Sequence, residues 1–144
     1  MRIIFSKTIG KREEINVLKN DIIKAFYKGI FTKIKGESLP TNSQLVKIYM
    51  TTIIGARRAV FLVDMVSHDS FFLFCRSKND KIGENVTIKN KFFKETLVKY
   101  LGILREDISS GNIEIIETSG KTSRNHINLR SKNIFRYYWG VAKW

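Results

Sequence analysis

The stretch of residues 45–78 constrains the fold more than any other part of this chain. Three runs in it, 45–52, 57–66 and 70–78, are rich in Val, Ile, Phe, Tyr and Leu, which fit a pleated surface. Only short breaks separate the runs, at 53–56 and 67–69. Because connections this short join neighbouring antiparallel strands, the pattern predicts a three-stranded meander.

Side chains alternate between the faces of a strand, so the two turns decide which residues share a face. If Thr52 pairs with Arg57 and Val66 with Ser70, one face collects apolar side chains and the other carries a basic cluster. The apolar face then contains Val46, Ile48, Met50, Ala59, Phe61, Val63, Met65, Phe71, Leu73 and Cys75. The basic face contains Lys47, Tyr49, Thr51, Arg58, Arg76 and Lys78.

In this register Arg58 stands directly opposite Lys78, with Arg76 on the diagonal. Unpaired like charges in such positions are destabilising, so we expect the cluster to receive a polyanion. Val60, Leu62, Phe72 and Phe74 point to the same face and need cover, so the site is expected to be a basic rim beside an apolar floor.

The rest of the chain predicts an α+β domain with the order β-α-β-β-β-α-β. Apolar steps of three and four residues indicate two amphipathic helices, whose apolar stripes we expect to pack together on the apolar face of an antiparallel sheet. The expected elements outside the meander are a strand at 2–9, a helix at 11–30, a loop at 31–43, a polar loop at 78–89, a helix from the N-cap Asn90 to about 110, and a strand at 113–117.

Charge is the unusual feature of the composition. The 144 residues include 26 Lys and Arg against 13 Asp and Glu, a net charge of +13 with a pI near 10.0. Such a balance favours a phosphate-bearing partner, an acidic protein or an anionic membrane surface. No apolar run is long enough to cross a membrane, and we expect a cytoplasmic protein.

Residues 1–117 are expected to form the domain, and residues 118–144 a basic, aromatic extension. The extension contains six basic residues, no acidic residue and the run Tyr137-Tyr138-Trp139. Three interpretations stay open for it: a packed terminal element, a nucleic-acid-contacting arm, or sequence foreign to the native fold. Without the extension the net charge is still +7.

The familiar motifs of nucleotide binding, metal binding and nucleophilic catalysis are absent from the sequence. Cys75 lies on the expected core face, and His68 and His126 lack zinc-ligand spacing, so we expect no metal and no cofactor. Arginine supplies a planar fork for phosphate oxygens, a lysine beside other cations can titrate, and Tyr49 offers a ring to stack on a base. Lys81 and Lys89, in the polar loop, are further candidates for RNA binding.

Two segments resemble the RelE/ParE toxins of bacterial toxin–antitoxin systems. They are Gly-Ala-Arg-Arg-Ala-Val-Phe-Leu-Val at 55–63 and Phe-Phe-Leu-Phe-Cys-Arg-Ser-Lys at 71–78, and the resemblance covers residues 2–117. The family's sheet arginine falls on Arg58, its basic residue at the next strand exit on Arg76 or Lys78, and the lysine of the preceding strand on Lys47.

The resemblance implies a metal-independent endoribonuclease, an mRNA interferase that inhibits translation, commonly at the ribosome, and is neutralised by a cognate antitoxin. Arg58 and Arg76 would stabilise charge on the phosphate, and Lys47 or Lys78 would act as acid or base. Family members often carry a further Tyr or His near the C-terminus, which cannot be matched here. The alternatives are a ParE-like gyrase inhibitor without nuclease activity and a non-catalytic nucleic-acid-binding module.

Overall fold

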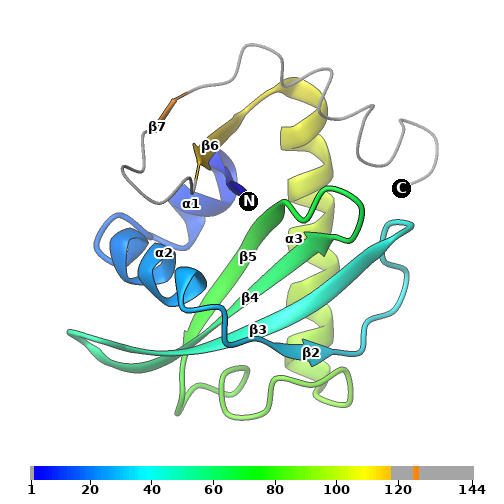
Figure 1. Ribbon diagram of the computed structural model, residues 1–144. Coiled ribbons are helices and arrows are strands. Elements are labelled where there is room, and N and C mark those ends of the chain that lie inside the picture. Colours follow the sequence, from blue (N-terminus) through cyan, green and yellow to red (C-terminus); the bar gives the residue numbers. More distant parts are fainter. Residues whose placement is uncertain (1, 118–124, 127–144) are drawn as a thin grey trace.

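The computed structural model describes residues 2–117 and 125–126, which form an α+β fold around one mixed sheet (Figure 1). The strand order across the sheet is β2-β3-β4-β5-β1-β6-β7. The helices are α1 (Lys7–Arg12), α2 (Lys19–Tyr27) and α3 (Lys91–Ser110). The strands are β1 (Arg2–Ser6), β2 (Thr32–Ile34), β3 (Ser43–Thr52), β4 (Gly55–Asp64), β5 (Ser70–Ser77), β6 (Ile113–Glu117) and β7 (Asn125–His126).

The antiparallel meander predicted for residues 45–78 is present as β3, β4 and β5, but its register differs from the prediction. Thr52 pairs with Gly55 instead of Arg57, which leaves a two-residue turn at 53–54. This shift of two positions preserves the alternation, so β3 and β4 keep their predicted faces.

Between β4 and β5 the error is larger, because the predicted pairing of Val66 with Ser70 does not form. Arg58 pairs with Arg76, not with Lys78, and Val63 pairs with Ser70. The register slips between Val60 and Phe61, where one extra residue of β5 is accommodated. Such a bulge reverses the alternation on one side of it, so Phe72 joins Phe61 on one face while Phe71 turns to the other.

The sheet is not purely antiparallel, as had been predicted. β1 lies between β5 and β6, and it runs parallel to β5 and antiparallel to β6. Ile3, Ile4 and Phe5 on β1 are at most 2% exposed, as expected for a central strand that is covered on both faces.

The single helix predicted for residues 11–30 is two helices joined by a turn. Ser6 caps the first one by accepting the N–H of Ile9, and its own hydroxyl donates to the buried Asp107 of α3. The chain leaves α1 at Glu13, and Glu14 then adopts a left-handed conformation with φ 50°. The loop predicted for 31–43 contains the short strand β2, which pairs with the first half of β3.

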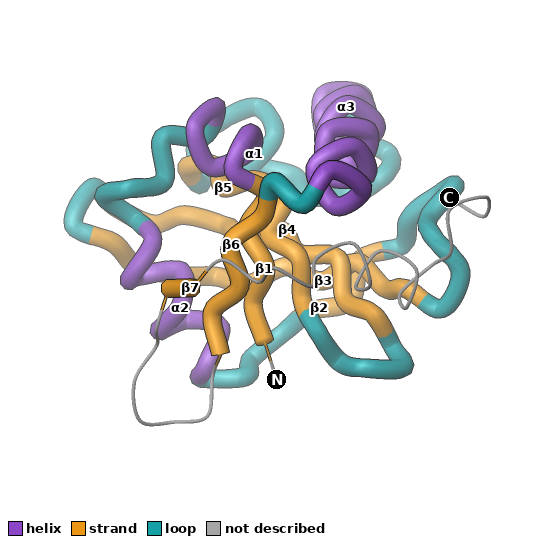
Figure 2. The backbone as a smooth tube through the Cα atoms, turned by 90° about the horizontal axis from the view of Figure 1, so that it is seen from above, coloured by secondary structure: helices purple, strands orange, loops and turns teal. Residues whose placement is uncertain are grey.

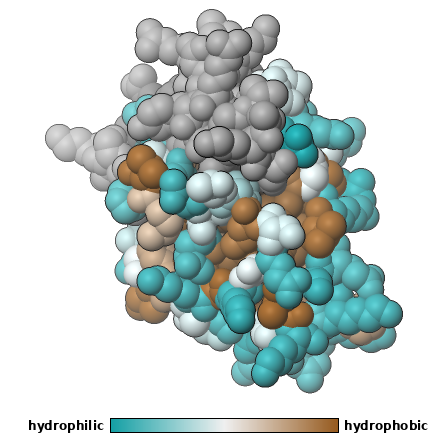
Figure 3. Space-filling view, turned by 90° about the vertical axis from the view of Figure 1, so that its right-hand side faces the viewer, coloured by the Kyte–Doolittle hydropathy of each residue, from teal (hydrophilic) through white to brown (hydrophobic). Residues whose placement is uncertain are grey.

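Helices cover both faces of the sheet, which corrects the prediction that they share one face. α2 lies on one side and α1 and α3 lie on the other (Figures 1 and 2). Phe26 of α2 packs on Phe61 with ring centroids 5.0 Å apart, whereas Phe93 of α3 packs on Phe74 at 5.8 Å. The four residues of the apolar floor expected beside the basic cluster are all buried: Phe74 packs against α3, whereas Phe72 packs with Phe61 on the α2 face. On the face shown in Figure 3, hydrophobic residues form patches between hydrophilic ones.

The helix and the strand predicted for residues 90–117 are confirmed as α3 and β6. The Asn90 side chain accepts the N–H of Phe92 at the start of α3, and Gly111, with φ 77°, ends it. β6 follows at the predicted residues, and β7 pairs with it. Asn125 and His126 are thus part of the sheet, while the rest of the predicted extension lies outside the described residues.

Candidate anion-binding site

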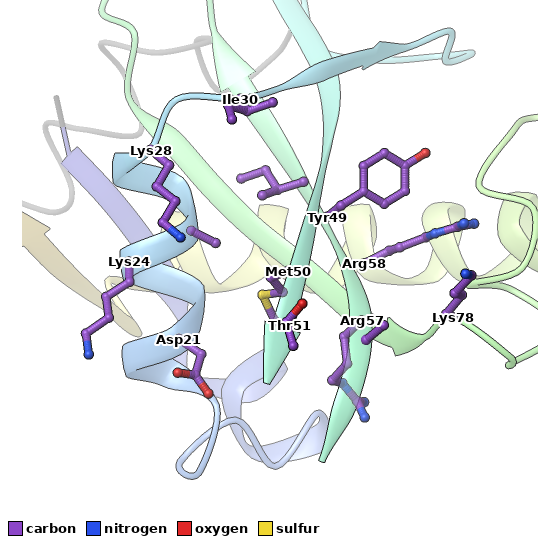
Figure 4. A pocket seen from close by; sticks show the side chains of 13 residues that line it. Asp21, Lys24, Lys28, Ile30, Tyr49, Met50, Thr51, Arg57, Arg58 and Lys78 are labelled. Atoms are coloured by element: carbon purple, nitrogen blue, oxygen red, sulfur yellow. The ribbon is translucent and has the colours of Figure 1, made fainter. Parts of the chain in front are cut away.

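A groove of about 620 Å³ lies between α2 and the outer end of the β3–β4 hairpin. Its lining includes Lys24 and Lys28 from α2, Arg57 and Arg58 from β4, and Lys78 just after β5. Asp21 is the single carboxylate in the lining within residues 2–117. Figure 4 shows the two lysines of α2 on one side of β3, with Arg58 and Lys78 on the other. We refer to this space as the cationic groove.

Arg58 is the most firmly positioned cation of the groove. One terminal nitrogen donates to the backbone oxygen of Gly83 and, at 2.9 Å, to that of Glu84. The guanidinium carbon lies 4.9 Å from the centroid of the Tyr49 ring, a cation–π distance. A guanidinium has five N–H groups, so these contacts orient Arg58 and leave donors for a ligand.

Gly83 explains how the loop after β5 reaches Arg58. A side-chain carbon at this position would lie 1.9 Å from the carbonyl oxygen of Ser77, so only glycine allows the two backbone segments to approach this closely. The carbonyl that holds Arg58 is therefore placed by a close backbone contact within the same loop.

Tyr49 lies between two cations on the surface of β3. The Nζ atom of Lys47 is 5.4 Å from the centroid of its ring, on the same strand, and Arg58 approaches from β4. The ring remains 54% exposed. Tyr49, Arg58 and Lys78 thus line one end of the groove, and Lys47 lies beside Tyr49 outside the groove lining. An exposed ring flanked by cations suits a stacked base.

Arg76 is predicted as a phosphate ligand, but its charge is already paired. Its guanidinium forms an ion pair with Glu13, whose side chain is 5% exposed, and it also donates to the Cys75 carbonyl. Burial acts to lower the pKa of Arg76, but the hydrogen bond and charge of Glu13 outweigh it and raise this pKa. The opposed arginines are tolerated because Glu13 neutralises one of them.

Glu13 also holds the neighbouring backbone and α3. It accepts the N–H of Cys75 at 3.0 Å and the hydroxyl of Tyr100 at 2.5 Å. Burial, and then the adjacent Glu13 carboxylate, raise the pKa of Tyr100. Burial is also the main reason that the pKa of the Cys75 thiol is raised, consistent with the predicted core position of that residue.

The structure does not bring Lys81 and Lys89 into the cationic groove. Lys81 lies over the ring of Phe92, with Nζ 5.2 Å from its centroid, and lines a separate shallow depression. Lys89 is exposed shortly before α3. The role in RNA binding that the sequence suggested for both lysines stays a prediction.

Three cations of the groove were missed from the sequence. Lys24 and Lys28 lie off the apolar stripe of their helix, so the sequence suggests ordinary solvent-exposed lysines. No neighbouring sequence indicates that α2 crosses the end of β3. Arg57 falls on the predicted apolar face; its Nε atom is buried without a hydrogen-bond partner among the described residues. The adjacent pair Arg57-Arg58 is the one signal that could have drawn attention to it.

Comparison with protein-family models, curated proteins and solved structures finds no match for this chain. Within residues 2–117 and 125–126, no group of three or more His, Cys, Asp or Glu side chains is placed to hold a metal ion. In the same residues, no helix combines the length and apolar character needed to cross a membrane.

Proposed function

We propose that this chain is the toxin of a type II toxin–antitoxin pair with a RelE/ParE-like fold, and that it cleaves messenger RNA as a metal-independent endoribonuclease in the cytoplasm. The observation that carries the proposal is the fixed position of Arg58 beside Lys78 and Tyr49 at the end of a groove with cationic walls. A polyanion with bases attached matches both the charge and the exposed ring.

The chemistry of such a cleavage assigns a role to each of these residues. The 2′-hydroxyl loses a proton and attacks phosphorus, a 2′,3′-cyclic phosphate forms, and the departing 5′-oxygen takes up a proton. Arg58 stabilises the charge that builds on the non-bridging oxygens, since a donor fixed before the reaction costs little reorganisation. Lys78, or Lys47 on the far side of Tyr49, supplies or accepts the proton. Arg76 does not contact the RNA in this proposal; its ion pair with Glu13 holds β5 in place beside the strand that carries Arg58.

The test is Arg58→Ala compared with Arg105→Ala, which removes an exposed arginine of α3 outside the groove lining. Loss of a charge-stabilising donor should reduce RNA cleavage by about a hundredfold or more. Growth inhibition should be lost with it, while the thermal melt stays near that of wild type. Primer extension on cellular transcripts reports the cleavage, and the Arg105→Ala protein should cleave normally.

Three outcomes would contradict the proposal. Normal cleavage by Arg58→Ala would remove the assigned site. Growth inhibition by the wild-type protein without RNA cleavage would favour the gyrase inhibitor, which a supercoiling assay can test directly. Binding of RNA with neither cleavage nor growth inhibition would favour a plain nucleic-acid-binding module.

A further inference from the structure

One edge of β3 is only half occupied by its neighbouring strand. β2 pairs with β3 through three positions, the last of which is Thr32 with Lys47. β3 continues to Thr52 while pairing with β4 on its other side. Residues 48–52 therefore have no strand beside their outer edge in the part of the chain that the structure describes.

The turn at 53–54 determines which backbone groups face that open edge. In a two-residue hairpin the flanking residues, here Thr52 and Gly55, form a hydrogen-bonded pair. Hydrogen-bonded and non-hydrogen-bonded pairs then alternate along the strand, so Tyr49 and Thr51 direct their N–H and C=O groups away from β4. Both residues are exposed. This edge thus presents a repeating set of two donors and two acceptors.

The cationic groove runs along this same edge. Lys24 and Lys28 approach it from the α2 side, and Arg58 and Lys78 approach from the other side (Figure 4). Among the residues that the structure describes, five cations and one carboxylate line the space, so a segment lying in it would be surrounded by positive charge. An unpaired strand edge of this kind is a ready template for another strand.

We propose that residues 48–52 bind an acidic, extended segment of a partner protein as an added strand of the sheet. Backbone hydrogen bonds to Tyr49 and Thr51 would supply affinity, and carboxylates on alternate residues, which all project to one face of the added strand, would meet the cations on that side of the edge. At about 3.4 Å per residue, five or six residues fill the edge. A nucleic acid lacks the matching alternation of donors and acceptors, and a second copy of this chain would bring the same cations face to face.

The inference is independent of the proposed ribonuclease activity, because it concerns binding alone. If that activity is present, the added strand would lie across Tyr49 and beside Arg58, and would block access to them. An acidic inhibitory partner would then act by occupying the groove directly.

The experiment uses the full chain labelled with ¹⁵N and a synthetic peptide, acetyl-(Glu-Val)₃-amide, with acetyl-(Lys-Val)₃-amide as the matched control. The acidic peptide at millimolar concentration should shift the amide signals of residues 48–52. It should also slow hydrogen exchange of the Tyr49 and Thr51 amides at least severalfold, and added salt should weaken both effects. The lysine peptide should leave these signals unchanged.

Backbone N-methylation of the peptide tests strand pairing without altering the protein. Methylation at every Glu or at every Val removes one alternate set of N–H groups, and only one of the two sets faces β3. One methylated peptide should therefore lose binding and the other retain it. The proposal is overturned if both methylated peptides still bind, if the lysine peptide binds equally, if the shifts fall outside the groove, or if an RNA oligonucleotide but not the acidic peptide slows exchange of the two amides.

Discussion

Replacement of Glu13 by alanine should be among the most destabilising single changes in this protein, although Glu13 lies in a polar turn of the sequence. Its carboxylate is buried and links the end of α1 to β5 and α3: it pairs with Arg76 and accepts the N–H of Cys75, both on β5, and it accepts the hydroxyl of Tyr100 on α3. Glu13→Ala leaves three donors without their acceptor in a largely dry region.

The magnitude follows from the burial of each partner. Removing one member of a buried ion pair costs about 3–5 kcal/mol, because the remaining charge is left uncompensated. The Arg76 side chain is 23% exposed and can recover some hydration, which favours the lower end of that range. We therefore expect a loss of about 3 kcal/mol in the free energy of unfolding, equivalent to roughly 6–12 °C in the melting temperature of a chain of this size.

Urea unfolding followed by circular dichroism measures this loss, and an unchanged m-value would show that the denatured state is unaffected. Glu95→Ala is the control, because its partner Lys91 and Glu95 itself are exposed and such a pair contributes about 0.5 kcal/mol or less. Arg76→Met combined with Glu13→Ala should cost less than the sum of the single changes, since the double variant leaves no unpaired charge. A loss of unfolding free energy below about 1 kcal/mol for Glu13→Ala, or strict additivity of the two single changes in the double variant, would refute the assignment of Glu13 as a buried link between β5 and α3.

Two further predictions concern the residues around the site. Gly83→Ala should destabilise the protein by about 2 kcal/mol, because the added carbon collides with the Ser77 carbonyl. It should also weaken RNA binding, because the collision displaces the carbonyl that holds Arg58. Chemical denaturation and an RNA-binding titration test the two effects, and an unchanged melting temperature would contradict the close contact. Because the pKa of Tyr100 is raised in the folded state, its contribution to stability is complete below the unfolded value of about 10 and is lost as the pH rises through the folded pKa. Melting temperatures of wild type and Tyr100→Phe should therefore converge at high alkaline pH, and a constant difference would argue against the raised pKa.

The candidate site shows how far sequence reasoning can go. Lys47, Tyr49, Arg58 and Lys78 could be grouped because alternation along strands is a local rule, and a register error of two residues does not change the face. Arg76 was assigned to the right face and the wrong role, because its partner Glu13 comes from a turn more than sixty residues away. Lys24 and Lys28 could not be found at all, since the path of α2 across the sheet depends on packing of Phe26 against Phe61.

The sequence alone determined the class of fold, the meander, the ends of α3 and the strong positive charge, because hydrophobic periodicity, turn length and capping act over a few neighbouring residues. Only the tertiary structure decided the parallel pairing of β1 with β5, the distribution of helices over both faces and the bulge between Val60 and Phe61. These features depend on contacts between segments far apart in the chain, where the choice between alternatives is made by the fit of the whole core. The open edge of β3 belongs to the same class, because it exists only where β2 stops.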